Sequence, residues 1–387
     1  MFNVLKLNEI SSKVNDILKK DKYAITDECK TPDAIILRSF DMHTYELPTS
    51  VVAIARAGAG VNNIPLDQMT AKSVCVFNTP GANANAVKEL VICALMLGSR
   101  KIVDGINWTK TLAGSDNVEK AVEKGKKEFI GREVYGKTLG VIGLGAIGRM
   151  VANTAIELGM NVIGYDPFLN VNGAMALDKH IKYVSDIKRV YTQSDYITLH
   201  VPATPDTKNS INEKTIAMMK QDVVLINCAR ADLVCNADVI KAVKAGKIGR
   251  YITDLPSADL LGVDNIIAIP HLGASTPEAE ENCAIMAANQ LKDYMENGNV
   301  TNSVNYPCAV APRTTANRIT VLHANVANMI AKATNYIASQ NINISNLVSA
   351  SRGEIGYMLI DIDKKLPDAT LKAMRNEEGF ICVRDYK

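Results

Sequence analysis

The segment "LGVIGLGAIGRMVANTAIELGMNVIGYDP", residues 139–167, constrains the fold more than any other stretch of the chain. A short apolar run ends at Gly143, a helical pattern follows, and a second apolar run ends just before Asp166. Gly143, Gly145 and Gly148 give the G-x-G-x-x-G spacing of a turn between a strand and a helix. The segment therefore predicts two parallel strands joined by a helix.

The same alternation recurs along much of the chain. Short apolar runs bounded by turn residues predict buried strands, and a helical pattern at 85–101 follows the first three of them. These runs are 33–38, 51–55, 74–77, 139–143, 161–165, 195–199, 223–227 and 266–269. We predict two doubly wound, Rossmann-like parallel sheets of the α/β class.

The pattern changes after Ser275. "STPE" predicts a helix start with Ser275 as the cap, and this helix runs to about Asn297. A polar, proline-bearing stretch follows at 298–316, which we interpret as containing a linker. Residues 317–387 then give the order strand, helix, strand, strand, helix, strand, which predicts a ferredoxin-like unit.

Composition limits the classes of function. A chain of 387 residues predicts roughly two to three domains, and 47% hydrophobic residues suffice for a large core. A net charge of +2 without a basic run argues against nucleic-acid binding. We find neither a signal-peptide pattern at the N-terminus nor an apolar stretch of about 18 residues. Eight cysteines without a C-x-x-C pair predict free thiols, with no metal, in a cytoplasmic protein.

The glycine loop predicts a dinucleotide site. Gly143 permits the tight turn, Gly145 lets the backbone approach a pyrophosphate, and Gly148 allows close packing of helix and strand. Free N–H groups at the helix start attract phosphate. Asp166 follows Gly143 by 23 residues, the spacing of an acid that binds ribose hydroxyls and repels a 2′-phosphate. NAD is therefore expected rather than NADP.

Three strand ends carry groups suited to 2-hydroxy acid chemistry. Arg230 follows one buried strand, a loop holds Asp254 and Asp259, and His271 follows another strand. Arginine suits a carboxylate clamp, and histidine suits transfer of the hydroxyl proton. Alone, His271 fits a core histidine better than a catalyst, but the loop and Arg230 favour the catalytic interpretation. His200 is expected to be structural or close to the cofactor.

These motifs resemble the D-2-hydroxyacid dehydrogenase family. The resemblance rests on "GLGAIG", Arg230, the Asp254/Asp259 loop and "PHLGAST", and "RAGAGVNN" with "NTPGANANAVKE" narrows it to the D-3-phosphoglycerate dehydrogenase branch. The C-terminal unit resembles an ACT domain. The resemblance implies a substrate-binding domain at 1–97 and 277–303, an NAD domain at 98–276, a linker at 304–316 and an ACT-like domain at 317–387.

The resemblance also implies roles for individual residues. Arg230 clamps the carboxylate, His271 is the acid/base and Asp259 is the acid beside it, although the family usually has Glu there. Asp232 stands where the family commonly has Gly. The expected NAD-binding residues are Gly143, Gly145, Ala146, Ile147, Gly148, Asp166, Val201, Pro202, Cys228, Ala229, Asp254, Gly273 and Ala274.

Further residues are expected to bind the substrate and an effector. Arg38 and Arg56 match phosphate- and carboxylate-side positions of the family, and Gly58, Ala59 and Asn83 complete the expected substrate set. In the C-terminal unit, His323, Asn325 and Asn343 match residues that bind L-serine across an interface between two such domains. Ala327-Asn328 replaces the Pro-Gly of the family there.

The expected reaction is NAD-dependent oxidation of 3-phospho-D-glycerate to 3-phosphohydroxypyruvate, the first step of serine synthesis, in a homodimer or homotetramer. Two alternatives remain open at this point. One is a dehydrogenase or reductase of another 2-hydroxy or 2-oxo acid, such as D-lactate or glycerate. The other is a regulatory protein that senses NAD without catalysis.

Overall fold

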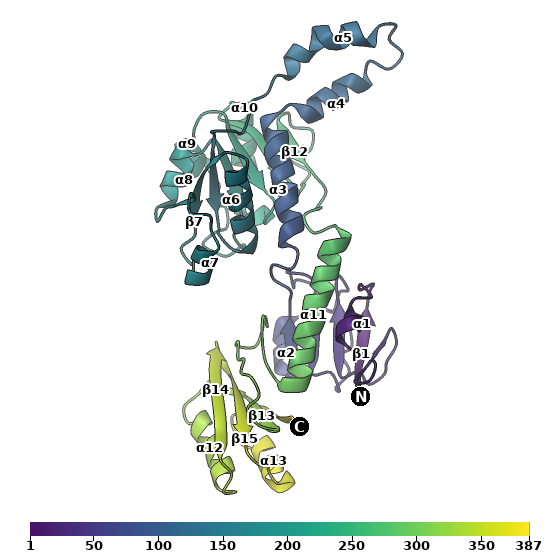
Figure 1. Ribbon diagram of the computed structural model, residues 1–387, viewed down its shortest axis with the longest axis vertical. Coiled ribbons are helices and arrows are strands. Elements are labelled where there is room, and N and C mark those ends of the chain that lie inside the picture. The colour runs from purple at the N-terminus through teal and green to yellow at the C-terminus, as the bar shows by residue number, and fades with distance from the viewer. Residues whose placement is uncertain (387) are drawn as a thin grey trace. The chain divides into compact units, whose positions relative to one another are not determined.

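The computed structural model describes residues 1–386 and divides the chain into two compact units (Figure 1). One unit contains Met1–Asn83 and Glu280–Lys387, and the other contains Ala84–Ala279. The fold class predicted from the sequence is confirmed, because each unit has one parallel sheet and the C-terminal part adds an antiparallel sheet. The domain boundaries given above remain a proposal.

The first unit begins with a five-stranded parallel sheet of order β2-β1-β3-β4-β5. The central strand β3 is buried on both faces, which explains its continuous apolar sequence AIIL. Two short helices, α1 (Val14–Ile17) and α2 (Leu66–Ala71), lie between strands. The strands are β1 (Phe2–Leu7), β2 (Tyr23–Thr26), β3 (Ala34–Leu37), β4 (Ala53–Arg56) and β5 (Cys75–Phe77).

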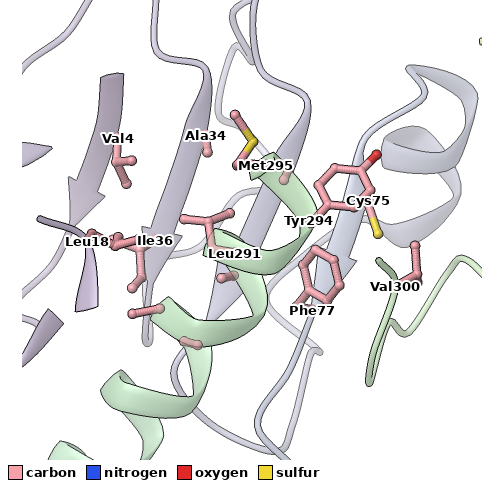
Figure 2. Close-up of a cluster of buried hydrophobic side chains, with 14 of the residues drawn as sticks. Val4, Leu18, Ala34, Ile36, Cys75, Phe77, Leu291, Tyr294, Met295 and Val300 are labelled. Carbon is pink, nitrogen blue, oxygen red and sulfur yellow. The ribbon is translucent and has the colours of Figure 1, made fainter. Parts of the chain in front are cut away.

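Helix α11 (Pro277–Asn297) supplies much of the core of this sheet. Figure 2 shows its side chains Leu291 and Tyr294 in one cluster with Ile36 of β3 and Phe77 of β5. The helix starts one residue later than "STPE" predicted, because Thr276 rather than Ser275 caps it. The Thr276 hydroxyl accepts a hydrogen bond from the Ala279 N–H at 3.1 Å.

The C-terminal part forms a four-stranded antiparallel sheet of order β14-β15-β13-β16. One face of this sheet buries its two helices in a core of its own. The other face contributes Leu322, Tyr357 and Leu359 to the core that contains α11. The elements are β13 (Asn317–Ala324), α12 (Met329–Ala338), β14 (Ile344–Arg352), β15 (Ile355–Ile362), α13 (Asp368–Arg375) and β16 (Phe380–Tyr386).

The segment expected to be a linker is packed into the first unit. Val300 forms a bridge with Ala309, and Ser303 forms one with Phe77 beside β5. Val300, Tyr306 and Ala309 are all buried in the α11 core. A shared core of this kind holds the C-terminal sheet firmly against the rest of its unit.

The second unit contains a seven-stranded parallel sheet of order β12-β11-β10-β9-β6-β7-β8. The strand order reverses between β6 and β9, which is where ligands bind in doubly wound sheets. Its strands are β6 (Thr138–Ile142), β7 (Asn161–Tyr165), β8 (Lys182–Tyr183), β9 (Tyr196–Leu199), β10 (Val223–Asn227), β11 (Ile248–Thr253) and β12 (Ile266–Ala268).

Helices cover this sheet, and one helical arm extends from it (Figure 1). The arm consists of α4 (Ile102–Lys110) and α5 (Val118–Gly125), and the Trp108 ring of α4 packs 5.1 Å from the Phe129 ring, which follows α5. The other helices are α3 (Ala84–Ser99), α6 (Ala146–Glu157), α7 (Val171–Met175), α8 (Ile187–Gln193), α9 (Glu213–Met218) and α10 (Asn236–Lys244), with 3-10 turns at Lys126–Phe129 and Ala231–Leu233.

Two further observations concern the described residues as a whole. None of the helices within residues 1–386 is both long and apolar enough to cross a membrane. All eight cysteines are free thiols.

Helix α3, which the sequence-based boundary at residue 97 assigned to the first domain, packs in the core of the second unit through Val91 and Leu95.

Candidate active site

The turn after β6 leaves space for glycine only. Gly143 has φ +95°, and a Cβ there would lie 2.5 Å from the carbonyl oxygen of His200, which follows β9. A Cβ on Gly148 would lie 1.9 Å from the carbonyl oxygen of Gly143. The predicted roles of these two glycines in the tight turn and in helix packing therefore agree with the backbone geometry.

The start of helix α6 is open to a ligand. Nothing lies within 4 Å of the Cβ position of Gly145, and both Gly145 and Ala146 are exposed. The first N–H groups of this 12-residue helix have no acceptor within the helix, so they suit a negatively charged phosphate. The loop therefore fits the pyrophosphate of a dinucleotide.

Asp166 lies at the carboxyl end of β7, directly beside this loop. Its Oδ2 accepts a hydrogen bond from the Leu144 N–H at 2.9 Å, and its Oδ1 accepts one from the Phe168 N–H at 2.8 Å. These bonds fix the carboxylate in place. Because each carboxylate oxygen has a second lone pair, the group can still accept the hydroxyls of a ribose.

Asp254 offers a buried acceptor that has no donor within the described residues. The side chain is 2% exposed, its Oδ2 accepts from the Gly273 N–H at 3.1 Å, and its Oδ1 has no partner. Burial, and then the Asp254 charge, raise the pKa of the neighbouring Cys228 thiol to about 12. A buried acceptor of this kind is costly unless a ligand supplies a donor. The carboxamide N–H₂ of nicotinamide is such a donor, so the residues present fit NAD.

Arg230 follows β10 in a loop that Asn227 organises. The fully buried Asn227 donates from Nδ2 to the Arg230 carbonyl at 2.9 Å and accepts from the Ala229 N–H at 3.1 Å. The exposed Arg230 guanidinium donates to the Ala229 carbonyl at 2.6 Å. Asp232, which replaces a common glycine of the family, is not at positive φ, so its backbone does not require glycine.

His271 and Asp259 lie in loops beside β12. His271 is exposed, and its carbonyl accepts from the Ser275 hydroxyl at 3.4 Å. Asp259 accepts from the Ser257 hydroxyl at 2.5 Å, which lowers the pKa of its carboxyl group, and from Asn236 at 3.4 Å. Within residues 1–386, no hydrogen bond or ion pair joins Asp259 to His271. The predicted pairing of these two side chains remains a proposal.

The remaining expected NAD-binding residues differ in burial. Cys228 is buried, Ala229, Val201 and Ala274 are half-buried, and Pro202 is exposed. Ile147 lies in the first turn of α6. His200 lies against Gly143 and Gly148, and burial lowers the pKa of its imidazole to about 3. A neutral, half-buried His200 agrees with a structural role near the cofactor.

The first unit brings Arg38 and Arg56 close together, at the ends of adjacent strands β3 and β4. Asn63 links their two segments, since its Oδ1 accepts from Arg56 Nε at 3.0 Å and its Nδ2 donates to the Arg38 carbonyl at 3.3 Å. Burial raises the pKa of the Cys283 thiol, and the charges of Arg38 and Arg56 oppose this increase.

Of the other expected substrate residues, Gly58 contacts the arginine pair. The Arg56 guanidinium lies over Gly58, where a Cβ would be 2.2 Å from Nη1. The Ala59 carbonyl accepts from Asn78 at 2.6 Å, which fixes the turn, and Asn83 immediately precedes α3. Sequence reasoning gave no role to Asn63, although it ends the motif "RAGAGVNN", or to Glu280, the ion-pair partner of Arg38, which lies outside the quoted motifs.

The C-terminal sheet has a pocket of about 280 Å³ that contains two of the three expected effector residues. His323 and Asn325 line it, and the buried Nε2 of His323 has no partner within the described residues. Asn328 also lines it and adopts φ 71°, the conformation that a glycine would provide. Asn343 precedes β14, while the pocket-lining Ser349–Ser351 lie toward the other end of that strand. One chain therefore does not bring all three residues together.

Comparison with known proteins agrees with this geometry. The open doubly wound sheet, the glycine loop and Asp166 define a Rossmann-type, NAD-binding unit. Residues 95–273 match the family model described as "D-isomer specific 2-hydroxyacid dehydrogenase, NAD binding domain". The chain is also 31% identical over 356 residues to an Escherichia coli D-3-phosphoglycerate dehydrogenase, covering 86% of this chain and 81% of the relative. The chain therefore belongs to the D-isomer specific 2-hydroxyacid dehydrogenase family.

Two other similarities extend the comparison. A D-3-phosphoglycerate dehydrogenase from Methanocaldococcus jannaschii is 36% identical over 314 residues, which is 79% of this chain but only 58% of that relative's length. The solved structure of an NAD⁺-bound 3-phosphoglycerate dehydrogenase from Entamoeba histolytica matches with a TM-score of 0.61 and 26% identity. That match covers 79% of this chain and 98% of the other.

Proposed function

We propose that this protein oxidises 3-phospho-D-glycerate to 3-phosphohydroxypyruvate with NAD, the first step of L-serine synthesis. The observation that carries the proposal is the arginine pair, Arg38 and Arg56, at adjacent strand ends and linked through Asn63. Two guanidinium groups suit a phosphate, which an unphosphorylated 2-hydroxy acid does not have. Two relatives described above are D-3-phosphoglycerate dehydrogenases by name, which supports the same substrate.

The proposal assigns a distinct task to each residue of the candidate site. Arg230 binds the substrate carboxylate and polarises the 2-oxygen, and Arg38 and Arg56 bind the phosphate. His271 accepts the proton of the 2-hydroxyl group as the C2 hydride leaves, and returns a proton in the reverse reaction. NAD, when bound, supplies the acceptor for that hydride. Asp259 stabilises the imidazolium form of His271.

A substrate panel tests the proposal directly. NADH absorbance would be followed with 3-phospho-D-glycerate, D-glycerate and D-lactate at equal concentrations. We expect the phosphorylated substrate to give the highest kcat/KM, and Arg38→Gln to remove most of that preference. A preference for D-lactate or D-glycerate would favour another 2-hydroxy acid dehydrogenase. NADH binding without turnover on any substrate would favour an NAD-sensing protein.

We also propose that L-serine binds the C-terminal pocket. The unpartnered Nε2 of His323 and the Asn325 amide provide a donor or acceptor for each charged group of a small zwitterion. Because Asn343 lies toward the other end of its strand, this proposal includes a second copy of the domain that supplies Asn343. Calorimetry with serine on the full chain tests it, as argued below.

A homodimer or homotetramer is proposed for the same reason. The helical arm also leaves three apolar side chains, Ile102, Ile106 and Val118, between 43% and 50% exposed, and a second copy of the chain would cover them. Light scattering coupled to size exclusion gives the mass of the assembly directly. A mass of 41.9 kDa, that of one chain, would contradict the proposal.

A further inference from the structure

A groove of about 680 Å³ lies in the first unit, away from the arginine pair and the C-terminal pocket described above. It is lined by residues from the N-terminal sheet and its loops, the end of α11, the segment 298–316, α13 and β16. Its charged residues are the cations Lys22, Arg313, Arg375 and Arg384 and the carboxylates Asp33, Glu296 and Asp385. No residue of this groove belongs to the candidate active site or to the expected serine site.

The carboxylates of the groove already have partners. Asp33 accepts from the Asn3 N–H at 2.7 Å. Glu296 accepts from the Tyr23 hydroxyl at 2.9 Å and pairs with Lys22 at 3.3 Å. Asp385 meets Arg375 at 3.4 Å, a loose contact at the exposed edge. The lining contains four cationic side chains and three carboxylates, so its formal net charge is +1.

Arg384 is a cation of the groove with no carboxylate partner within residues 1–386. Its guanidinium donates to the Tyr294 hydroxyl and, at 3.0 Å, to the Ser73 carbonyl. Its Cζ lies 5.8 Å from the centre of the Tyr294 ring. Within residues 1–386, no carboxylate comes within ion-pair distance of it. Neutral acceptors and one aromatic ring compensate a partly buried cation only in part, so an anion beside it would be stabilised.

We propose that this groove binds a small anion of the phosphate class, with Arg384 and Arg375 as its principal ligands. A planar guanidinium group can bind two phosphate oxygens, and the two arginines come from strand β16 and helix α13. The anion would contact β16 and α13 on one side and the end of α11 on the other. Binding therefore stabilises the junction between the C-terminal sheet and the N-terminal sheet.

The source of the phosphate group can be an inorganic anion or a phosphate ester. Both share the chemistry that arginines recognise, so the test includes inorganic pyrophosphate and glycerol 3-phosphate as separate probes. Sodium chloride at matched ionic strength provides the control for screening. Tighter binding of pyrophosphate would identify a polyphosphate site, and tighter binding of the ester would identify a site for a phosphorylated metabolite.

The experiment is calorimetric titration of the full chain with each probe, without substrate or cofactor. Arg375→Gln is the main variant, because Arg375 is exposed and its loss does not open the core. Lys372→Gln is the matched control, since it removes one positive charge from an exposed position of the same helix outside the groove. Arg38→Gln identifies any separate binding at the proposed substrate site.

We expect Arg375→Gln to weaken the groove event about tenfold and Lys372→Gln to change it less than about twofold. A second variant, Arg384→Lys, should weaken the same event while far-ultraviolet circular dichroism stays unchanged. No binding at millimolar probe, or equal loss in Arg375→Gln and Lys372→Gln, would overturn the proposal. Loss of all binding in Arg38→Gln alone would also overturn it, and none of these outcomes depends on turnover.

Discussion

The guanidinium of Arg38 and the carboxylate of Glu280 form an ion pair, with Nη1 2.5 Å from Oε1. Arg38 follows β3, and Glu280 lies in the first turn of α11, where a negative charge is favoured by the helix dipole. Both side chains are partly exposed, at 38% and 44%. A substrate phosphate that binds Arg38 must therefore share it with Glu280 or displace that carboxylate.

Glu280→Gln should improve the apparent affinity for 3-phospho-D-glycerate. Because exposed ion pairs contribute about 0–1 kcal/mol, we expect KM to fall by up to about fivefold while kcat changes little. Glu278→Gln is the matched control, since it removes an exposed negative charge two residues before Glu280 in the same helix. A KM that stays equal in Glu280→Gln and wild type would contradict competition for Arg38.

Asp166→Asn should reduce the preference for NAD over NADP. The amide oxygen can still accept one of the two backbone hydrogen bonds that hold the side chain, but the charge that repels a 2′-phosphate is removed. We expect the ratio of kcat/KM for NAD to that for NADP to fall about tenfold, which corresponds to about 1.4 kcal/mol. Equal use of both cofactors by the wild-type protein would contradict the ribose argument.

His271→Ala should abolish most turnover and leave NADH binding intact. Loss of a general acid/base typically lowers kcat by about 10²–10⁴-fold, whereas the glycine loop and Asp166 are unaffected. NADH fluorescence gives the binding constant, and stopped assays give the rate. His180→Ala is the control, because His180 is an exposed histidine of the same unit that pairs with Asp178 at 2.8 Å. Near-normal turnover in His271→Ala would make His271 a structural residue.

The buried ion pair of Arg318 and Asp361 should dominate the stability of the C-terminal junction. Arg318 Nε lies 2.6 Å from Asp361 Oδ1, and the two side chains are 0% and 1% exposed. Arg318→Met leaves a buried carboxylate unpaired, so we expect the free energy of unfolding to fall by about 3–5 kcal/mol in urea titrations. Combining Arg318→Met with Asp361→Leu should restore much of this loss, and failure to recover would indicate lost packing instead.

The same pair predicts a pH dependence of stability. Burial alone would raise the pKa of Asp361, but hydrogen bonds from Arg318 and Thr314 outweigh it, so the pKa is lowered. A group with a lowered pKa in the folded state stabilises the protein above its unfolded pKa of about 4 and loses this effect as the pH falls through the folded value. The stability difference between wild type and Asp361→Asn should therefore decrease in acid.

Motifs with a strict local geometry were predictable from the sequence. The turn at Gly143 and Gly148, the acid at Asp166 and the buried strands such as β3 all express local patterns, and the structure has them where the sequence placed them. Strands β1, β2, β8 and β11 were not predicted, and Lys6 and Arg250 interrupt the apolar pattern of β1 and β11. Arg250 is tolerated there because it forms an ion pair with Asp104 of the distant helix α4.

Long-range contacts between polar groups explain the rest of what the sequence did not predict. The Arg38–Glu280 pair, the hydrogen bond from Asn63 to the Arg38 carbonyl and the bridge between Ser303 and Phe77 each join segments that are distant in the chain. Such contacts depend on the tertiary structure and have no periodic pattern. The polar composition of residues 298–316 predicted a linker, yet Tyr306 and Ala309 are buried in the α11 core.

The last prediction concerns serine and the C-terminal pocket. Asn325→Ala removes a side chain that lines the pocket, and Asn343→Ala removes one toward the other end of β14. If serine binds across two copies of the domain, each variant should weaken binding to the full chain by at least about tenfold, because each loses hydrogen bonds to a charged ligand. Asn376→Ala, an exposed position after α13, is the matched control and should bind as the wild type does.

Binding that depends on Asn325 but not on Asn343 would place the site within one chain. If titration of the wild type with millimolar serine produces no binding heat, serine is not an effector of this protein. If serine binds but NADH formation does not change, serine does not act as a feedback inhibitor.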